Sequence, residues 1–202
     1  LPISLEDIDR IEVIRGPAAA SYGANAFMGV INILTQSHEG GKRIGIMAGS
    51  GGHGYRELSA RVGAASEAGS WRLSVGQRAD DYYANVADDV RDRYLDGRGD
   101  WNLTGADTLS VMGGMAHSRL DDDIAAGQTF PVNVHSAYGQ VSWRHVHHAN
   151  AETRLAYDLT RQSYSDDLDL GGSPLPIDLG FSTHRQNLTA GWKGVLGARM
   201  RA

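Results

Sequence analysis

Two opposite charges lie inside a short apolar segment near the start of the chain. Glu12 and Arg15 are interspersed with Ile11, Val13 and Ile14 in a run that is typical of a buried strand. A charge that is buried without a partner costs several kcal/mol, so each of these side chains needs a counter-charge or a hydrogen bond. Glu12 and Arg15 are therefore the first candidates for a specific contact, and the alternative is a surface pair on an edge strand.

Two further clusters contain side chains that can bind metal ions. His145 and His147 share one face of a predicted strand, but the sequence places no carboxylate beside them, so we interpret them as polar residues next to a turn. The acidic groups at 121–123 and 166–169 lack the spacing of a calcium-binding loop and are interpreted as solvated loop tips. The sequence therefore predicts no metal site.

Catalytic motifs are absent from the sequence. There is no nucleophile elbow, no metalloprotease helix and no phosphate loop. The glycine-rich stretch Gly49–Gly54 lacks both the Lys-Ser/Thr pair and a following helix, and a hairpin loop explains it better. Cysteine is also absent, which excludes disulfides and thiolate metal sites. We therefore expect a protein that is not an enzyme and needs no cofactor.

The elements that position Glu12 and Arg15 are two short strands, Ile11–Arg15 and Val30–Thr35. The dipeptide Gly16-Pro17 between them is a turn signal, because glycine allows positive φ and proline fixes φ. A variant of the capping box precedes the first strand and predicts a short helix at roughly residues 5–10.

The stretch from Ile8 to Thr35 resembles the end of the plug domain of TonB-dependent outer-membrane receptors. The matching residues are Glu12, Arg15, Gly16, Pro17, Tyr22, Gly23, Ala26, Gly29, Val30, Ile31, Asn32 and Ile33. The resemblance implies that Glu12 and Arg15 lie at the contact between plug and barrel, with Arg15 in a buried ionic cluster with barrel carboxylates. It also implies structural roles for Gly16, Pro17, Tyr22, Gly23, Gly29 and Asn32. Met28 departs from the family pattern, which often has a second glycine there.

From Lys42 onward, apolar and polar residues alternate with a period of two. The alternation predicts eight strands, at about 42–50, 54–64, 70–79, 93–103, 108–118, 134–147, 151–163 and 183–194. Short and long connections alternate after the first hairpin, as in outer-membrane barrels with short periplasmic turns and longer external loops. Tyrosine and tryptophan fall near strand ends, which favours interfacial belts, although aromatic residues are common in any strand.

These patterns predict a mainly β protein: an antiparallel meander of about eight strands from a transmembrane β-barrel, preceded by a small α+β plug remnant. The predicted domains are the C-terminal part of the plug, residues 1–36, and the N-terminal portion of the barrel, residues 37–202. Eight strands leave an interior only wide enough for side chains and cannot enclose a plug. We therefore expect an open, curved sheet over the plug remnant, as a fragment of a longer receptor.

The resemblance implies active uptake of a scarce solute, a ferric siderophore or a cobalamin-like chelate, across the outer membrane of a Gram-negative bacterium. The implied partners are TonB, through a segment that precedes residue 1, outer-membrane lipid, and an extracellular metal chelate. The formal net charge of −5 gives no reason to expect nucleic acid. No residue identifies the ligand. Two alternatives stay open: a small outer-membrane barrel or adhesin, and a soluble all-β binding module or enzyme.

Overall fold

The computed structural model describes residues 3, 7–16, 28–36, 42–81, 89–124, 128–168, 177–178 and 180–194. These residues form a two-stranded sheet and a nine-stranded sheet. A search of the described residues finds no helix with the length and apolar character needed to span a membrane.

The two-stranded sheet is an antiparallel hairpin of β1 (Ile8–Arg15) and β2 (Gly29–Thr35). Both predicted strands are confirmed, but the helix predicted at 5–10 is wrong for residues 8–10, which belong to β1. Pairing of Ile8 with Thr35 gives the backbone of this segment partners across the hairpin, and this outweighs the local capping signal. Asp7, just before β1, has a 3₁₀-helical conformation, and the two strands make up the regular structure of the rest of the described remnant.

Two glycines of the plug-like motif have conformations or contacts that a larger residue would not allow. Gly16 follows β1 with φ of +97°, a conformation that residues with a side chain rarely adopt, and its N–H donates to the carbonyl of Met28 at 3.2 Å. A Cβ atom on Gly29 would lie 2.6 Å from the backbone oxygen of Ile14. Glycine at position 29 is therefore needed for the close approach of the two strands.

The large sheet is an antiparallel meander. Its strands are β3 (Lys42–Ser50), β4 (Arg56–Ser66), β5 (Gly69–Asp80), β6 (Val90–Asn102), β7 (Asp107–Ile124), β8 (Gln128–His148), β9 (Ala151–Leu168), β10 (Ile177–Asp178) and β11 (Phe181–Gly194). Neighbours in sequence pair from β3 to β9, and β10 and β11 both pair with β9. All eight predicted strands are present, and several are longer than predicted. Residues 121–123, predicted as a loop tip, belong to β7, because pairing with β8 continues to Ile124 opposite Gln128.

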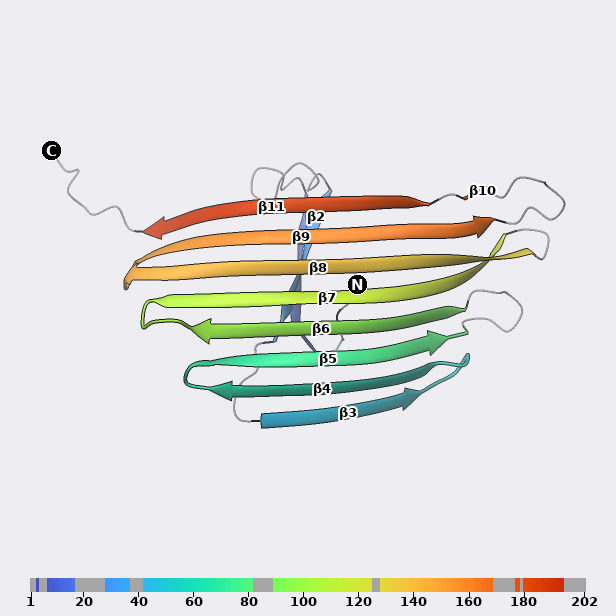
Figure 1. The fold of residues 1–202 in the computed structure, drawn as a ribbon, viewed down its shortest axis with the longest axis horizontal. Coiled ribbons are helices and arrows are strands. Elements are labelled where there is room, and N and C mark those ends of the chain that lie inside the picture. The colour runs from blue at the N-terminus through green and yellow to red at the C-terminus, as the bar shows by residue number, and fades with distance from the viewer. Residues whose placement is uncertain are drawn as a thin grey trace.

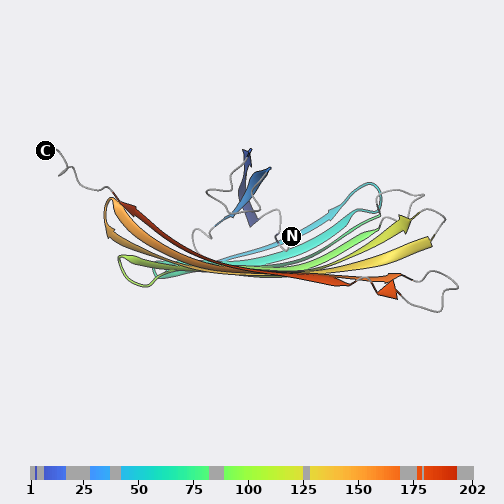
Figure 2. The same cartoon turned by 90° about the horizontal axis from the view of Figure 1, so that it is seen from above.

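The connections at the two ends of the sheet differ only in part in length. Short turns join β4 to β5, β6 to β7 and β8 to β9 at one end; at the other end the connections from β5 to β6 and from β9 to β11 are longer, whereas β7 and β8 extend to Ile124 and Gln128 and leave a short connection instead of the predicted long loop (Figure 1). The sheet is open and curved, and the β1–β2 hairpin lies over its concave face (Figure 2). We call this face inward and the opposite face outward.

The outward face is apolar across the middle of the sheet. Its exposed side chains include Ile44, Ile46, Leu58, Val62, Leu73, Val75, Leu95, Val111, Met115, Val141, Leu155, Tyr157 and Leu188. All four tryptophans of the chain, Trp71, Trp101, Trp143 and Trp192, lie on this face near the end with the short turns. An apolar band bordered by tryptophan matches the lipid-facing surface of a transmembrane barrel.

The apolar band runs obliquely to the strand register. The row of paired residues that begins at Ile46 in β3 stays apolar through Ala137 in β8, then becomes polar at Arg161 and His184. Another row starts from the apolar Trp192 in β11. It becomes polar at its partner Thr153 in β9 and stays polar at His145 in β8. A band that crosses the register is what strands tilted by roughly 35–45° from the barrel axis, and so from the membrane normal, would present to lipid.

Candidate functional site at the contact between hairpin and sheet

The base of the hairpin is the part that contacts the sheet. Asp7 directly precedes β1 and Gln36 directly follows β2, and the Gln36 N–H donates to the Asp7 carbonyl at 2.8 Å. This bond brings the two ends of the hairpin together over the inward face. Asp7 is fully buried although it is charged, so its carboxylate requires cationic partners.

Arg72 of β5 is the central partner of Asp7. Its guanidinium lies 2.5 Å from Asp7 Oδ2 and 2.8 Å from Asp96 Oδ1 of β6, and its Nε donates to the Gln36 carbonyl at 3.2 Å. Arg61 of β4 lies 3.2 Å from the second oxygen of Asp7. Tyr138 of β8 donates its hydroxyl to the other oxygen of Asp96. Four strands of the sheet and both ends of the hairpin thus meet in one ionic cluster.

Arg98 of β6 makes the second contact between hairpin and sheet. Its Nη1 donates to both the carbonyl and the hydroxyl oxygen of Thr35 at 3.0 Å. Asp100 holds the same guanidinium through two contacts, the closer at 2.7 Å, and accepts a hydrogen bond from Ser110 at 2.6 Å. With Arg61 and Arg72, Arg98 places three guanidinium groups against the carboxylates of Asp7, Asp96 and Asp100, so the formal charge of this contact is balanced.

The structure places Glu12 away from this ionic cluster. Glu12 accepts hydrogen bonds from Arg10 at 2.9 Å and from Asn32 at 3.1 Å, all within the hairpin. These bonds lower the pKa of the Glu12 carboxyl, and the bond to Glu12 raises the pKa of Arg10. Asn32, which was predicted to have a structural role, links β2 to β1 through its hydrogen bond to Glu12. No described residue of the sheet forms a hydrogen bond or an ion pair with Glu12.

Arg15, the second predicted contact residue, is exposed at the end of β1 and forms no ion pair with any residue that the structure describes. Gly16 and Gly29 fit the predicted structural role through the turn and the close approach described above. Pro17, Tyr22 and Gly23 lie outside the described residues.

The residues that do join hairpin and sheet were not predicted as a site. Asp7 lies in the capping-box variant that predicts a helix, and Arg61, Arg72, Asp96 and Arg98 lie in the alternating segments that predict strands. One sequence signal was available: Arg72, Asp96 and Arg98 are charged residues well inside predicted strands, and such a charge needs a partner if another part of the protein covers it. Their common partner at position 7 follows only from the register of the sheet.

The histidine cluster at the short-turn end makes local contacts. His145 lies 2.7 Å from Asp107 Oδ1, which also accepts a hydrogen bond from Trp143 at 3.1 Å, and His147 contacts the hydroxyl of Thr153 at 2.8 Å. Asp107 is the neighbouring carboxylate that the sequence alone did not locate. No group of three or more potential metal ligands is found among the described residues.

Comparison with known proteins agrees with this arrangement of hairpin and sheet. Residues 1–30 match the TonB-dependent receptor plug domain. In this segment the chain is similar to TonB-dependent receptors. Members of this family are transporters of the Gram-negative outer membrane and are not enzymes.

The chain is similar to several curated transporters. It is 39% identical to the vitamin B12 transporter BtuB of Vibrio cholerae over 82 residues, which are 40% of this chain and 13% of BtuB. It is 27% identical to the ferric enterobactin receptor of Pseudomonas aeruginosa over 81% of this chain and 25% of that receptor. In these sequence alignments the chain therefore covers a quarter or less of the length of each receptor.

Solved structures share the fold of the chain. The copper transporter OprC superposes with a TM-score of 0.68 at 16% identity, over 95% of this chain and 32% of OprC. The ferric enterobactin receptor PfeA of Pseudomonas aeruginosa superposes with a TM-score of 0.59 at 22% identity, over 91% and 33% of the two chains. The mainly β meander and its hairpin thus have the fold of a portion of these two structures.

Proposed function

We propose that this chain supplies the C-terminal part of the plug, residues 1–36, and the opening barrel strands, residues 37–202, of a receptor that imports a scarce solute. The observation that carries the proposal is the buried Asp7–Arg72–Asp96 cluster. It attaches a hairpin with the plug motif to the inward face of a sheet whose outward face is apolar. A plug attached to the inside of a barrel is the arrangement that such import requires.

The transported solute is a metal chelate, either a ferric siderophore or a cobalamin-like compound. The support is that curated relatives are named for vitamin B12 and ferric enterobactin. The partners in this proposal are TonB, through a segment outside this chain, the lipid of the outer membrane, and the extracellular chelate itself. Glu12 and Arg15 are proposed to contact barrel strands outside this chain, since Arg15 has no ion-pair partner among the described residues.

Uptake measurements test this function. Cells of the source bacterium lacking the gene, and the same cells complemented with it, would be supplied with radiolabelled cyanocobalamin or with ⁵⁵Fe-enterobactin, in strains with and without a working TonB. We expect one of the two chelates to accumulate only with both the gene and TonB present. Accumulation of neither chelate would overturn the proposed ligand class, and accumulation independent of TonB would overturn the proposed energy source.

A further inference from the structure

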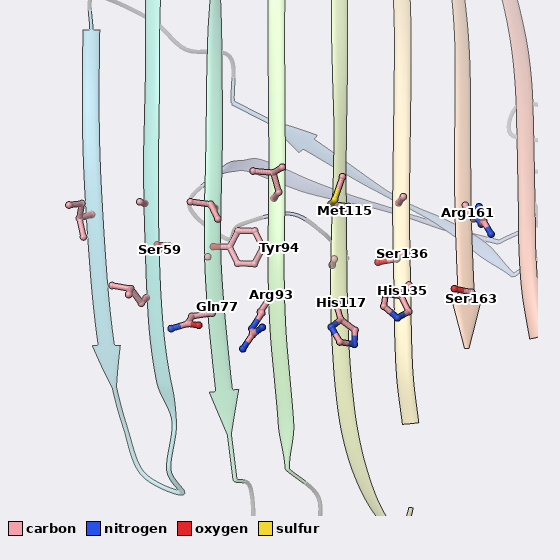
Figure 3. A pocket seen from close by; sticks show the side chains of 18 residues that line it. Ser59, Gln77, Arg93, Tyr94, Met115, His117, His135, Ser136, Arg161 and Ser163 are labelled. Atoms are coloured by element: carbon pink, nitrogen blue, oxygen red, sulfur yellow. The ribbon is translucent and has the colours of Figure 1, made fainter. Parts of the chain in front are cut away.

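The outward face changes character at the end opposite the tryptophans. One row of paired residues there is polar across five strands, and it consists of Gln77, Arg93, His117, His135 and Ser163 on β5 to β9 (Figure 3). The next row toward the middle of the sheet is apolar, with Val75, Leu95 and Met115, until it reaches Arg161. The polar row therefore marks the edge of the apolar band.

Positive charge is concentrated on this part of the outward face. The basic and histidine side chains there are Arg56, Arg91, Arg93, Arg119, Arg161, His117, His135 and His184. No carboxylate occupies an outward strand position at this level among the side chains that the structure describes. The nearby carboxylates Glu57, Asp80 and Asp92 belong to the inward face, where Asp92 lies 2.5 Å from Arg78. The described strand carboxylates at this depth thus lie on the inward face, while the outward strand positions carry the basic and histidine side chains.

A hollow of about 990 Å³ lies where the polar row meets the apolar band. Leu58, Val75, Leu95 and Met115 line its apolar half, and Arg93, His117, His135 and Arg161 line its polar half. The rings of His117 and His135 stack with their centroids 4.4 Å apart and their planes 2° from parallel. Arg93 and Arg161 are exposed, and neither forms an ion pair with any residue that the structure describes.

We propose that this hollow binds a phosphorylated lipid of the outer leaflet. Arg93 and Arg161 would donate to the phosphate, the stacked histidines would add N–H donors, and an acyl chain would lie along Leu95 and Met115. Guanidinium pairs with phosphate through parallel hydrogen bonds, and cations at a membrane interface attract anionic headgroups. A lipid matches both halves of the hollow, because its charge and its apolar chain are adjacent.

The location of the hollow favours lipid as the occupant. It lies on strands inside the sheet, so further barrel strands that pair with the edges at β3 and β11 would leave it uncovered. It is also continuous with the apolar band that we assign to the bilayer. The proposal rests on the proposed function only in requiring that this sheet lie in the outer membrane with its long connections outside.

Lipid binding to the protein purified from outer membranes in detergent tests the inference. Native mass spectrometry would measure binding of bis-phosphorylated lipid A to the wild type, to an Arg93→Gln/Arg161→Gln variant, and to a matched Arg144→Gln/Arg154→Gln variant. Arg144 and Arg154 are exposed arginines on the inward face of β8 and β9. We expect the first variant to bind the lipid about tenfold or more weakly, since charge-assisted hydrogen bonds are lost, and the control to bind like the wild type.

A second comparison requires no variant. The wild type should bind dephosphorylated lipid A about tenfold more weakly than the bis-phosphorylated form. Equal binding of the two lipids, or wild-type affinity in the Arg93→Gln/Arg161→Gln variant, would overturn the inference and leave the proposed function intact. Failure to recover the protein from outer membranes at all would instead count against the proposed function.

Discussion

Asp7 is the residue on which the contact between hairpin and sheet depends. It is fully buried, and its carboxylate lies between the guanidinium groups of Arg61 and Arg72. Losing one member of a buried ion pair leaves the remaining charges without compensation, which typically costs about 3–5 kcal/mol. Because Arg72 keeps Asp96 as a second partner, we expect a cost at the lower end of that range.

The Asp7→Asn substitution tests this role. Amide hydrogen exchange of the β1–β2 hairpin, measured by mass spectrometry on the protein from outer membranes, should become faster by a factor that corresponds to about 3 kcal/mol of local stability. Asp9→Asn is the matched control, because Asp9 is 51% exposed and, within the part of the chain that the structure describes, pairs only with Arg10. Unchanged exchange in Asp7→Asn, or an equal increase in both variants, would show that Asp7 does not hold the hairpin.

Glu12 makes a pH-dependent contribution to the hairpin. Hydrogen bonds from Arg10 and Asn32 lower its folded-state pKa below the ordinary value of 4.5. A group with a lowered pKa stabilises the folded state above its unfolded pKa, and this stabilisation is lost as pH falls through the folded-state pKa. Wild type should therefore exceed Glu12→Gln in thermal stability at pH 7, and the difference should disappear on acidification below the ordinary carboxyl range. A difference that persists unchanged at low pH would contradict this assignment.

At the scale of the strand, neighbouring residues face different surroundings. Val141 of β8 faces outward and is 46% exposed, whereas Gln140 before it faces inward. An arginine at the lipid face of a barrel costs about 2–4 kcal/mol near the bilayer midplane, while a lumen-facing arginine stays hydrated. Val141→Arg should therefore lower the free energy of unfolding from lipid vesicles by about that amount, and Gln140→Arg should leave it nearly unchanged. Equal effects of the two substitutions would contradict the assignment of the faces.

Strand positions could be predicted from the sequence because lipid and lumen impose a strict alternation. The pattern around Trp71, Leu73 and Val75 requires no knowledge of tertiary contacts, and β5 lies where it was predicted. The hairpin of β1 and β2 followed from its turn glycine and apolar runs. The helix predicted at residues 8–10 is wrong because a local pattern was not enough to decide the structure. The capping pattern indicated a helix, but pairing with β2 makes these residues part of a strand.

The candidate site was harder to predict because its members are distant in sequence. Asp7 and Arg72 meet only after the sheet has set its register and the hairpin has docked on it. Glu12 and Arg15 stood out because they interrupt an apolar run, but their local environment in the described structure is the hairpin itself. Alternation predicts which face a charge occupies, whereas the identity of its partner depends on docking.

At the scale of the whole molecule, the four tryptophans define one border of the membrane-facing band. Trp71, Trp101 and Trp192 are 44%, 39% and 56% exposed on the outward face near the short turns. Indole side chains favour the headgroup level of a bilayer. In vesicles, a lipid with a nitroxide near its headgroup should quench the tryptophan fluorescence more strongly than one with a nitroxide near the chain end. Stronger quenching by the deep probe would contradict the proposed border.

The two edges of the large sheet are unpaired among the described strands, and this limits what the sheet can do in a membrane. The sheet ends at β3 and β11 with no further pairing among the described strands, and unpaired strand edges are not tolerated in lipid. An eight-stranded barrel has no room for a plug inside it. Import through a plugged barrel therefore requires additional strands that pair with both edges.

The intact mass of the native product, taken from a washed outer-membrane fraction and identified by peptides of this sequence, decides between a receptor and a small independent protein. We expect a mass several times the 21.7 kDa of this chain, with the hairpin and the sheet inside one larger plugged barrel. A folded, membrane-inserted product near 21.7 kDa would contradict the assignment to a receptor and leave a small barrel without import activity.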